Sequence, residues 1–171
     1  MPSASLIKEF EQLVGKGNVF SSEADRQSYA YDAAVLKPMI PSLVVRPTEV
    51  EQLGQVVKRC YEEGIPMTVR GSGTNLTGGT IPDCSDTIVI LTTGLNKILE
   101  INTEDLYATV QPGVITAKFA AAVAAKGLFY PPDPGSMSVS TIGGNVAESS
   151  GGLRGLKYGT TKDYVMGLEF Y

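Results

Sequence analysis

The sequence predicts an α+β protein made of two lobes, and three observations lead to this prediction. Residues 42–70 combine apolar, β-branched runs with one amphipathic stretch, as in a strand–helix–strand unit. Residues 98–112 hold two short β-rich runs joined by a polar turn, which indicates a hairpin. The chain has 171 residues, of which 43% are hydrophobic, and this is enough for one domain or two small lobes.

Residues 1–38 are expected to form a helical lead. The apolar residues of 3–16 share one helical face, and Gly15 and Gly17 end this helix. Residues 21–38 are polar and predict a link that contains at most a short helix.

The first lobe is predicted over residues 39–100. After Pro41, "SLVVRP" has the pattern of a buried strand. Thr48 and Glu51 have the spacing of a capping box for the helix that follows, and Gly64 ends that helix. "IPMTVR" and "TIVILTT" predict two more strands, so the first strand–helix–strand unit is expected to be a right-handed parallel crossover.

The second lobe is predicted over residues 101–171. Residues 114–126 are rich in alanine and predict a helix, whereas residues 131–159 are rich in glycine, proline and small hydroxyl residues and predict a long loop. The final residues, "YVMGLEFY", have the pattern of a strand. An apolar strand at the very end indicates a chain cut within a domain, the alternative being a terminal strand paired inside a sheet.

Composition excludes several classes of function. A net charge of −4 without a long basic run argues against nucleic-acid binding, and no apolar run is long enough to span a membrane. Cys60 and Cys84 have no CxxC spacing and are expected to be reduced, buried thiols of a cytoplasmic protein. The absence of histidine excludes Ser-His-Asp and Cys-His catalysis and histidine-ligated zinc, so no catalytic or metal-binding residue is predicted.

The most informative stretch is "PMTVRGSGTNLTGGT" at residues 66–80. It lacks the Rossmann glycine spacing, and Gly79 stands where a P-loop needs lysine, so a degenerate P-loop ATPase is a weak alternative. Glycines let the backbone approach a ligand closely, and successive N–H groups then form an anion-binding concavity. A tight structural connection would explain only one or two of these glycines.

A second region of similar character contains "TIGGN" at residues 141–145 and "SSGG" at residues 149–152. Two such loops, separated by a hairpin and a helix, suit an extended ligand with a diphosphate at its middle. A dinucleotide or flavin adenine dinucleotide (FAD) has this size.

The motifs "PSLVVRPTEVEQL", "PMTVRGSGTNLTGG", "VQPGV", "PPDPGS", "TIGGNVAESSGG" and "KYGTTKDYVMGLE" occur in this order between residues 40 and 171. In combination they closely resemble the FAD-binding subunit of glycolate oxidase and the related D-lactate dehydrogenases of the vanillyl-alcohol oxidase superfamily. The resemblance implies a PCMH-type FAD-binding domain with a small β-α-β lobe, a larger lobe with a mixed or antiparallel sheet, and FAD stretched between them.

By this resemblance, one group of residues would wrap the pyrophosphate and a second would contact the flavin side, the diphosphate and the ribityl chain. The first group is Arg70, Gly71, Ser72, Gly73, Thr74, Asn75, Gly78 and Gly79. The second group is Pro112, Gly113, Pro134, Gly135, Ser136, Thr141, Gly143, Gly144, Asn145, Ser149, Gly151 and Gly152. Thr74 stands where some members of the superfamily carry a histidine bonded to the flavin, so the resemblance implies non-covalent FAD.

The resemblance implies oxidation of a 2-hydroxy acid, glycolate or D-lactate, with hydride transfer to flavin N5. The family's substrate domain is missing from this sequence, so the chain alone is expected to be inactive. Iron–sulfur and second flavin-domain subunits are the implied partners, and they would account for any peripheral attachment to a membrane. Two alternatives stay open: a non-catalytic FAD-binding or structural fragment, and a flavin reductase of the enolpyruvyl sugar nucleotide type.

Overall fold

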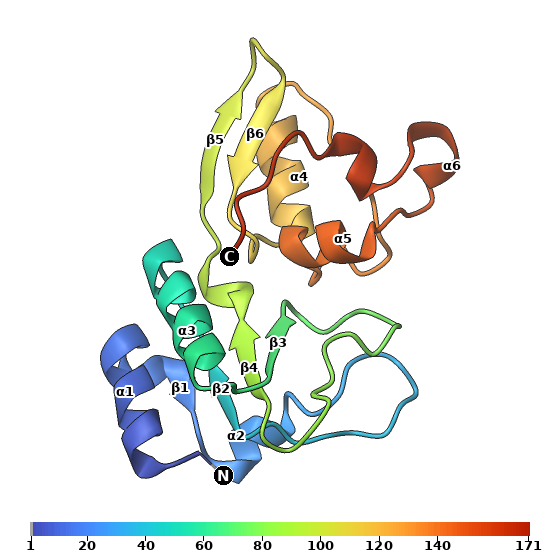
Figure 1. The fold of residues 1–171 in the computed structure, drawn as a ribbon. Helices are drawn as coiled ribbons and strands as arrows, with labels where there is room; N and C mark the ends of the chain where they lie inside the picture. The colour runs from blue at the N-terminus through green and yellow to red at the C-terminus, as the bar shows by residue number, and fades with distance from the viewer. Residues whose placement is uncertain (1) are drawn as a thin grey trace. The chain divides into compact units, whose positions relative to one another are not determined.

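A computed structural model describes residues 2–171 and confirms the α+β prediction (Figure 1). By its internal contacts the chain forms two compact units. The first extends to Gly94 and includes Tyr171, and the second covers residues 95–170. The sequence predicts the boundary between the lobes at residues 100 and 101. That position lies inside the strand Ile98–Asn102, whose hairpin partner lies wholly in the second unit.

The first unit contains a four-stranded sheet in the order β1-β2-β4-β3. The strands are β1 (Val19–Phe20), β2 (Leu43–Val45), β3 (Met67–Arg70) and β4 (Ile88–Leu91). β2 and β3 both pair with β4 in parallel, so β4 lies between the two strands of the predicted crossover. The edge strand β1 pairs antiparallel with β2 and is too short to produce a recognisable sequence pattern.

The helices α1 (Ala4–Val14) and α3 (Val50–Glu62) pack against one face of this sheet. Alternation along the strands directs Leu43 and Val45 toward these helices and Val44 toward the opposite face, and all three are fully buried. The two central strands, β2 and β4, are therefore buried on both faces, as expected for parallel strands. A short helix, α2 (Glu23–Gln27), interrupts the polar link.

The capping box of α3 lies one residue later than predicted. The N-cap is Glu49, and the Gln52 side chain accepts hydrogen bonds from the backbone N–H groups of Glu49 at 3.2 Å and Thr48 at 2.9 Å. Gln52 is therefore the residue that closes the box, because the first helical turn begins at Val50 and places Gln52, not Glu51, at its third position.

The second unit contains the predicted hairpin of β5 (Ile98–Asn102) and β6 (Tyr107–Val110) and the alanine-rich helix α4 (Thr116–Ala124). Its core is formed by Val114, Phe119, Val123 and Ile142. Two further helices follow, α5 (Ile142–Glu148) and α6 (Gly155–Tyr158), and 3₁₀ turns occur at Lys16–Asn18, Thr92–Gly94 and Thr161–Tyr164.

Three expectations were wrong. The region 131–159 is not one long loop, because it contains α5 and α6. Residues 165–171 form no strand, since no neighbouring strand of the described chain pairs with them. Cys60 is buried as predicted, but Cys84 lies in an irregular, polar segment and is exposed. Among residues 2–171, no helix is long and apolar enough to cross a membrane.

Candidate functional site

The glycine-rich loop, defined here as residues 71–80, begins at the carboxyl end of β3 and leads toward β4. These residues form neither helix nor strand, so their backbone is not committed to regular hydrogen-bond ladders. Gly73 has a φ of 70° and Gly78 a φ of 79°, which are conformations that other residues rarely adopt. The loop therefore needs glycine at these two positions for its own shape.

Arg70 lies at the start of this loop, and only 6% of its surface is exposed. Its Nη1 atom donates to the backbone oxygen of Tyr31 at 2.7 Å, and its guanidinium lies 5.8 Å from the centre of the Tyr29 ring. Burial lowers the pKa of Arg70 and the nearby Asp32 carboxylate opposes this effect, but an arginine keeps its charge in proteins. The loop thus has a fixed positive charge at its base.

The position of the guanidinium gives Gly73 a second constraint. A Cβ atom at Gly73 would lie 2.1 Å from Nη2 of Arg70, and one at Gly78 would lie 2.4 Å from Cδ1 of Leu36. Any side chain at Gly73 would therefore displace the guanidinium as well as strain the backbone.

A carboxylate from a distant segment contacts the same loop. Asp32 accepts a hydrogen bond from Nδ2 of Asn75 at 2.6 Å, and it is itself buried. Sequence reasoning did not select Asp32, Tyr29 or Tyr31, because they lie in a link that has no periodic pattern. The sequence "YAYDAA" offers one signal, since two tyrosines and an aspartate are unusual in an otherwise solvent-exposed connection.

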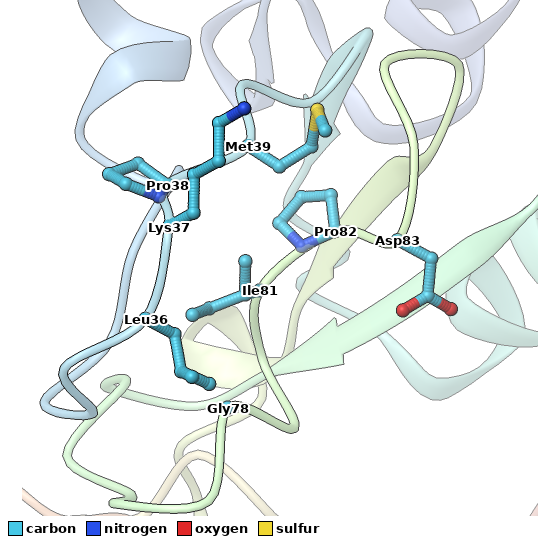
Figure 2. Close-up of a pocket in the computed structure, with 8 residues that line it drawn as sticks. All are labelled: Leu36, Lys37, Pro38, Met39, Gly78, Ile81, Pro82 and Asp83. Carbon is cyan, nitrogen blue, oxygen red and sulfur yellow. The ribbon is translucent and has the colours of Figure 1, made fainter.

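A shallow groove of about 300 Å³ borders the loop at Gly78. Figure 2 shows its two walls: residues 36–39 lie on one side and residues 81–83 on the other. Most of the lining is apolar, contributed by Leu36, Pro38, Met39, Ile81 and Pro82, while Lys37 and Asp83 add one charge of each sign. The groove thus offers apolar contact directly beside a polar loop.

In the second unit, "TIGGN" forms the first turn of α5. Thr141 is the N-cap, and its hydroxyl accepts from the N–H of Gly144 at 3.3 Å. The N–H of Ile142 donates to Val114, and the N–H of Gly143 donates to Pro112. These hydrogen bonds attach the first turn of α5 to the segment that follows β6. The motif therefore has a structural role in addition to any role in binding.

Asn145 has a buried structural role too. Only 1% of its surface is exposed, and its Nδ2 donates to the hydroxyl of Thr116 at 2.7 Å. That hydroxyl also lies 2.8 Å from the hydroxyl of Ser140. This buried chain of hydrogen bonds ties α5 to the start of α4.

The remaining predicted residues of this unit form turns around Asp133. Gly152 has a φ of 134°, and a Cβ atom there would lie 2.1 Å from the backbone oxygen of Asp133. The oxygen of Gly151 accepts from the N–H of Asp133, and the oxygen of Pro134 accepts from Met137 in the next turn. The other predicted residues differ in their surroundings: Gly135 is exposed, Ser149 is the left-handed C-cap of α5, and Gly113 is buried, with its N–H donating to the oxygen of Leu95.

The structure therefore gathers the predicted residues into two groups, one in each unit. The first group combines the buried cation of Arg70, at the end of β3, with the irregular loop that follows it. Within the second group, Pro112 and Gly143 contact each other, and Gly151 and Gly152 lie beside Asp133 next to Pro134. The first group suits an anionic ligand such as a diphosphate, because a flexible glycine backbone and a positive charge meet there.

Comparison with known proteins shows the family to which the chain belongs. Residues 41–171 match the family described as "FAD binding domain", and the chain therefore belongs to this family. FAD is accordingly its cofactor, as the sequence predicted.

Individual relatives support the finer resemblance. The chain is 52% identical over 169 residues to the glycolate oxidase subunit GlcD of Bacillus subtilis (strain 168), covering 99% of this chain and 36% of that protein. It is 35% identical to a D-lactate dehydrogenase of Anaerostipes hadrus, covering 95% and 34%. The predicted resemblance to these two proteins is confirmed. The chain spans about a third of the length of these relatives.

A solved structure supports the fold. An alkyldihydroxyacetonephosphate synthase structure superposes with a TM-score of 0.86 at 21% identity, over 95% of this chain and 32% of that one. At this identity the likeness concerns the fold alone, and it confirms the predicted PCMH-type architecture.

Proposed function

We propose that this chain is the FAD-binding part of a flavin-dependent oxidoreductase that converts a 2-hydroxy acid to the 2-oxo acid. Glycolate and D-lactate are the leading substrates, because the names of the relatives with 52% and 35% identity specify these two acids. When bound, FAD would supply the acceptor for the hydride that leaves the α-carbon of the acid.

One observation carries this proposal: the irregular loop of residues 71–80 lies against the buried guanidinium of Arg70. A diphosphate is doubly charged and needs several donors, which backbone N–H groups in a glycine-rich loop can provide without steric hindrance. Arg70 adds a positive potential from below the loop, and its burial strengthens this electrostatic contribution. The proposed contacts are Arg70, Gly71, Ser72, Gly73, Thr74, Asn75, Gly78 and Gly79.

Thr74 supports non-covalent binding. It has no nucleophilic nitrogen to bond to the flavin ring, and the whole sequence contains no histidine. We expect FAD to leave the protein on denaturation and to be recovered intact in the supernatant.

The predicted residues of the second unit would bind other parts of the cofactor. They are Pro112, Gly113, Pro134, Gly135, Ser136, Thr141, Gly143, Gly144, Asn145, Ser149, Gly151 and Gly152. Their internal hydrogen bonds support two different roles. Buried residues such as Asn145 would hold the turns in place, and exposed residues such as Gly135 would contact FAD.

Activity and assembly belong to the whole protein. A substrate domain would bind and orient the hydroxy acid, and the subunit name of the Bacillus subtilis relative supports assembly with other subunits. Iron–sulfur and second flavin-domain subunits are the proposed partners, in the cytoplasm or at a membrane surface through those partners.

Titration of the flavin-free protein with FAD, followed by quenching of flavin fluorescence, tests cofactor binding. Gly73→Val should abolish saturable binding, because its side chain would displace Arg70 and strain the loop. Gly17→Ala is the matched control, since a Cβ atom there meets nothing within 4 Å, and it should bind FAD like the wild type. Absence of binding to the wild type, or equal binding by Gly73→Val, would contradict the proposed site.

A second measurement tests the reaction and separates it from a non-catalytic role. Anaerobic addition of glycolate or D-lactate to the flavin-loaded complete protein should bleach the absorbance of the oxidised flavin. Bound FAD that neither acid reduces would instead support the non-catalytic alternative.

A further inference from the structure

Asp32 occupies a central position behind the glycine-rich loop. One carboxylate oxygen, Oδ1, accepts from the backbone N–H of Ala34 at 2.8 Å, which fixes the carboxylate on its own segment. The other, Oδ2, accepts from Nδ2 of Asn75 at 2.6 Å and lies 3.3 Å from the hydroxyl of Thr80. Asp32 thus contacts two loop residues that are separated by five positions.

The same contacts continue to Arg70. The Thr80 hydroxyl lies 3.0 Å from Oδ1 of Asn75 and accepts from Nη1 of Arg70 at 3.3 Å. A hydroxyl has a single proton, so the Thr80 hydroxyl shares its hydrogen bond between Asp32 and Asn75. The oxygen of the same hydroxyl accepts the hydrogen bond from Arg70. The backbone oxygen of Asn75 also accepts from the N–H of Ala33 at 3.2 Å. The loop is therefore held at Asn75 and Thr80 by one segment, residues 32–34.

The charges in this network are complementary and shielded from water. Asp32 is 8% exposed and Arg70 is 6% exposed, and hydrogen bonds to a buried charged group are stronger than those between neutral groups. The carboxylate also compensates the cost of burying the guanidinium beneath the loop.

We infer that Asp32 is a positioning residue, which holds the glycine-rich loop in the conformation that binds the diphosphate of FAD. This inference rests on the proposed function of the loop. Asp32 acts through Asn75, Thr80 and Arg70, and it contributes to affinity by ordering the loop before the cofactor arrives, so that binding does not have to supply this ordering.

A general structural role makes a different prediction. If Asp32 only stabilised the fold, then any substitution that destabilised the first unit equally would weaken FAD binding equally. Val56 offers this comparison, because it is fully buried in the core between α3 and the sheet and is no part of the network. Asp86→Asn is the control for charge, since it removes one exposed carboxylate of the same unit, just before the amino end of β4.

The experiment compares the wild type, Asp32→Asn, Val56→Ala and Asp86→Asn. The first readout is amide hydrogen exchange of residues 71–80 in the flavin-free protein, and the second is the FAD dissociation constant. Asp32→Asn should speed exchange in the loop and raise the dissociation constant by about tenfold or more, because it removes the charge from the network. Val56→Ala and Asp86→Asn should leave both quantities close to those of the wild type, although Val56→Ala lowers the unfolding midpoint.

A double variant tests the mechanism. Asp32→Asn combined with Asn75→Asp exchanges the carboxylate and the amide across the same hydrogen bond, so the pair and its charge are retained. Amide exchange of residues 71–80 in the flavin-free protein should slow at least partly relative to Asp32→Asn. Exchange is the readout here because Asn75→Asp also places a carboxylate at a proposed contact of the diphosphate.

Each result decides between the alternatives. Unchanged loop exchange or unchanged FAD affinity in Asp32→Asn would overturn the inference, and so would an equal loss of affinity in Val56→Ala. Failure of the wild type to bind FAD would instead overturn the proposed function. The exchange measurement needs no cofactor, so it would still show whether Asp32 orders the loop.

Discussion

Gly143 and Pro112 are in direct contact: the N–H of Gly143 donates to the oxygen of Pro112 at 2.8 Å, in the first turn of α5. A Cβ atom at position 143 would lie 2.6 Å from Cβ of Pro112 and 3.1 Å from its Cα. Position 143 therefore needs glycine because α5 packs closely against the segment that follows β6.

Gly143→Ala should accordingly destabilise the protein by about 1–2 kcal/mol. Overpacking costs about 1–3 kcal/mol, and the better helix propensity of alanine returns up to about 1 kcal/mol. Urea unfolding followed by circular dichroism measures the difference. Gly144→Ala is the matched control in the same turn, since its nearest neighbour is the Thr141 hydroxyl at 3.2 Å. It has the same gain in helix propensity without the clash against Pro112, so it should leave stability unchanged or raise it by up to about 1 kcal/mol.

The buried hydrogen bonds around Thr116 allow a second prediction. Thr116→Val keeps the shape of the side chain but removes the acceptor for Asn145 and the contact with Ser140. A buried donor left without a partner should cost about 2 kcal/mol in the free energy of unfolding. Thr109→Val, at an exposed position of β6, is the control and should stay within about 0.5 kcal/mol of the wild type. Equal effects of the two variants would contradict the importance of the buried network.

Cys60 predicts a dependence on alkaline pH. Burial raises the pKa of this thiol from its ordinary 9.0 to about 11, so the folded protein keeps the proton over a range in which the unfolded chain loses it. The resulting stabilisation is present below pH 9 and is lost as the pH rises from 9 to about 11. Cys60→Ala lacks this contribution. The amount by which the unfolding midpoint of the variant lies below that of the wild type should therefore shrink between pH 8 and about pH 11. A constant deficit would show that the thiol does not titrate differently in the two states.

The two cysteines should also differ in reactivity. Cys84 is exposed, whereas Cys60 lies in the core between α1, α3 and the sheet. Iodoacetamide at pH 8 should modify Cys84 in the native protein and Cys60 only after denaturation, as measured by intact mass and peptide mapping. Cys84→Ser should then show no modification of the native protein, and labelling of this variant without denaturant would reveal opening of the core.

Much of the fold followed from local patterns. The apolar stripe of α1, the all-apolar strands β2 and β4 and the β5–β6 hairpin were predicted because each is long or distinctive enough to show its own period. The region 131–159 was misread as a loop because glycines in "TIGGN" mask a helix whose first turn is stabilised by Pro112 and Val114. Such stabilisation comes from residues about 30 positions away and leaves no local pattern in the sequence.

The sequence by itself determined that a glycine-rich backbone and a basic residue meet in "RGSGTNLTGG", because both features lie within ten consecutive residues. It also determined the family, because the order of several motifs is a property of the chain alone. The tertiary structure decided that Arg70 is buried beneath Gly73 and that Asp32 supports the loop through Asn75. Asp32 and Asn75 are 43 positions apart, and only folding, which buries Asp32 beside the half-buried Asn75, brings a carboxylate from a featureless link to the loop.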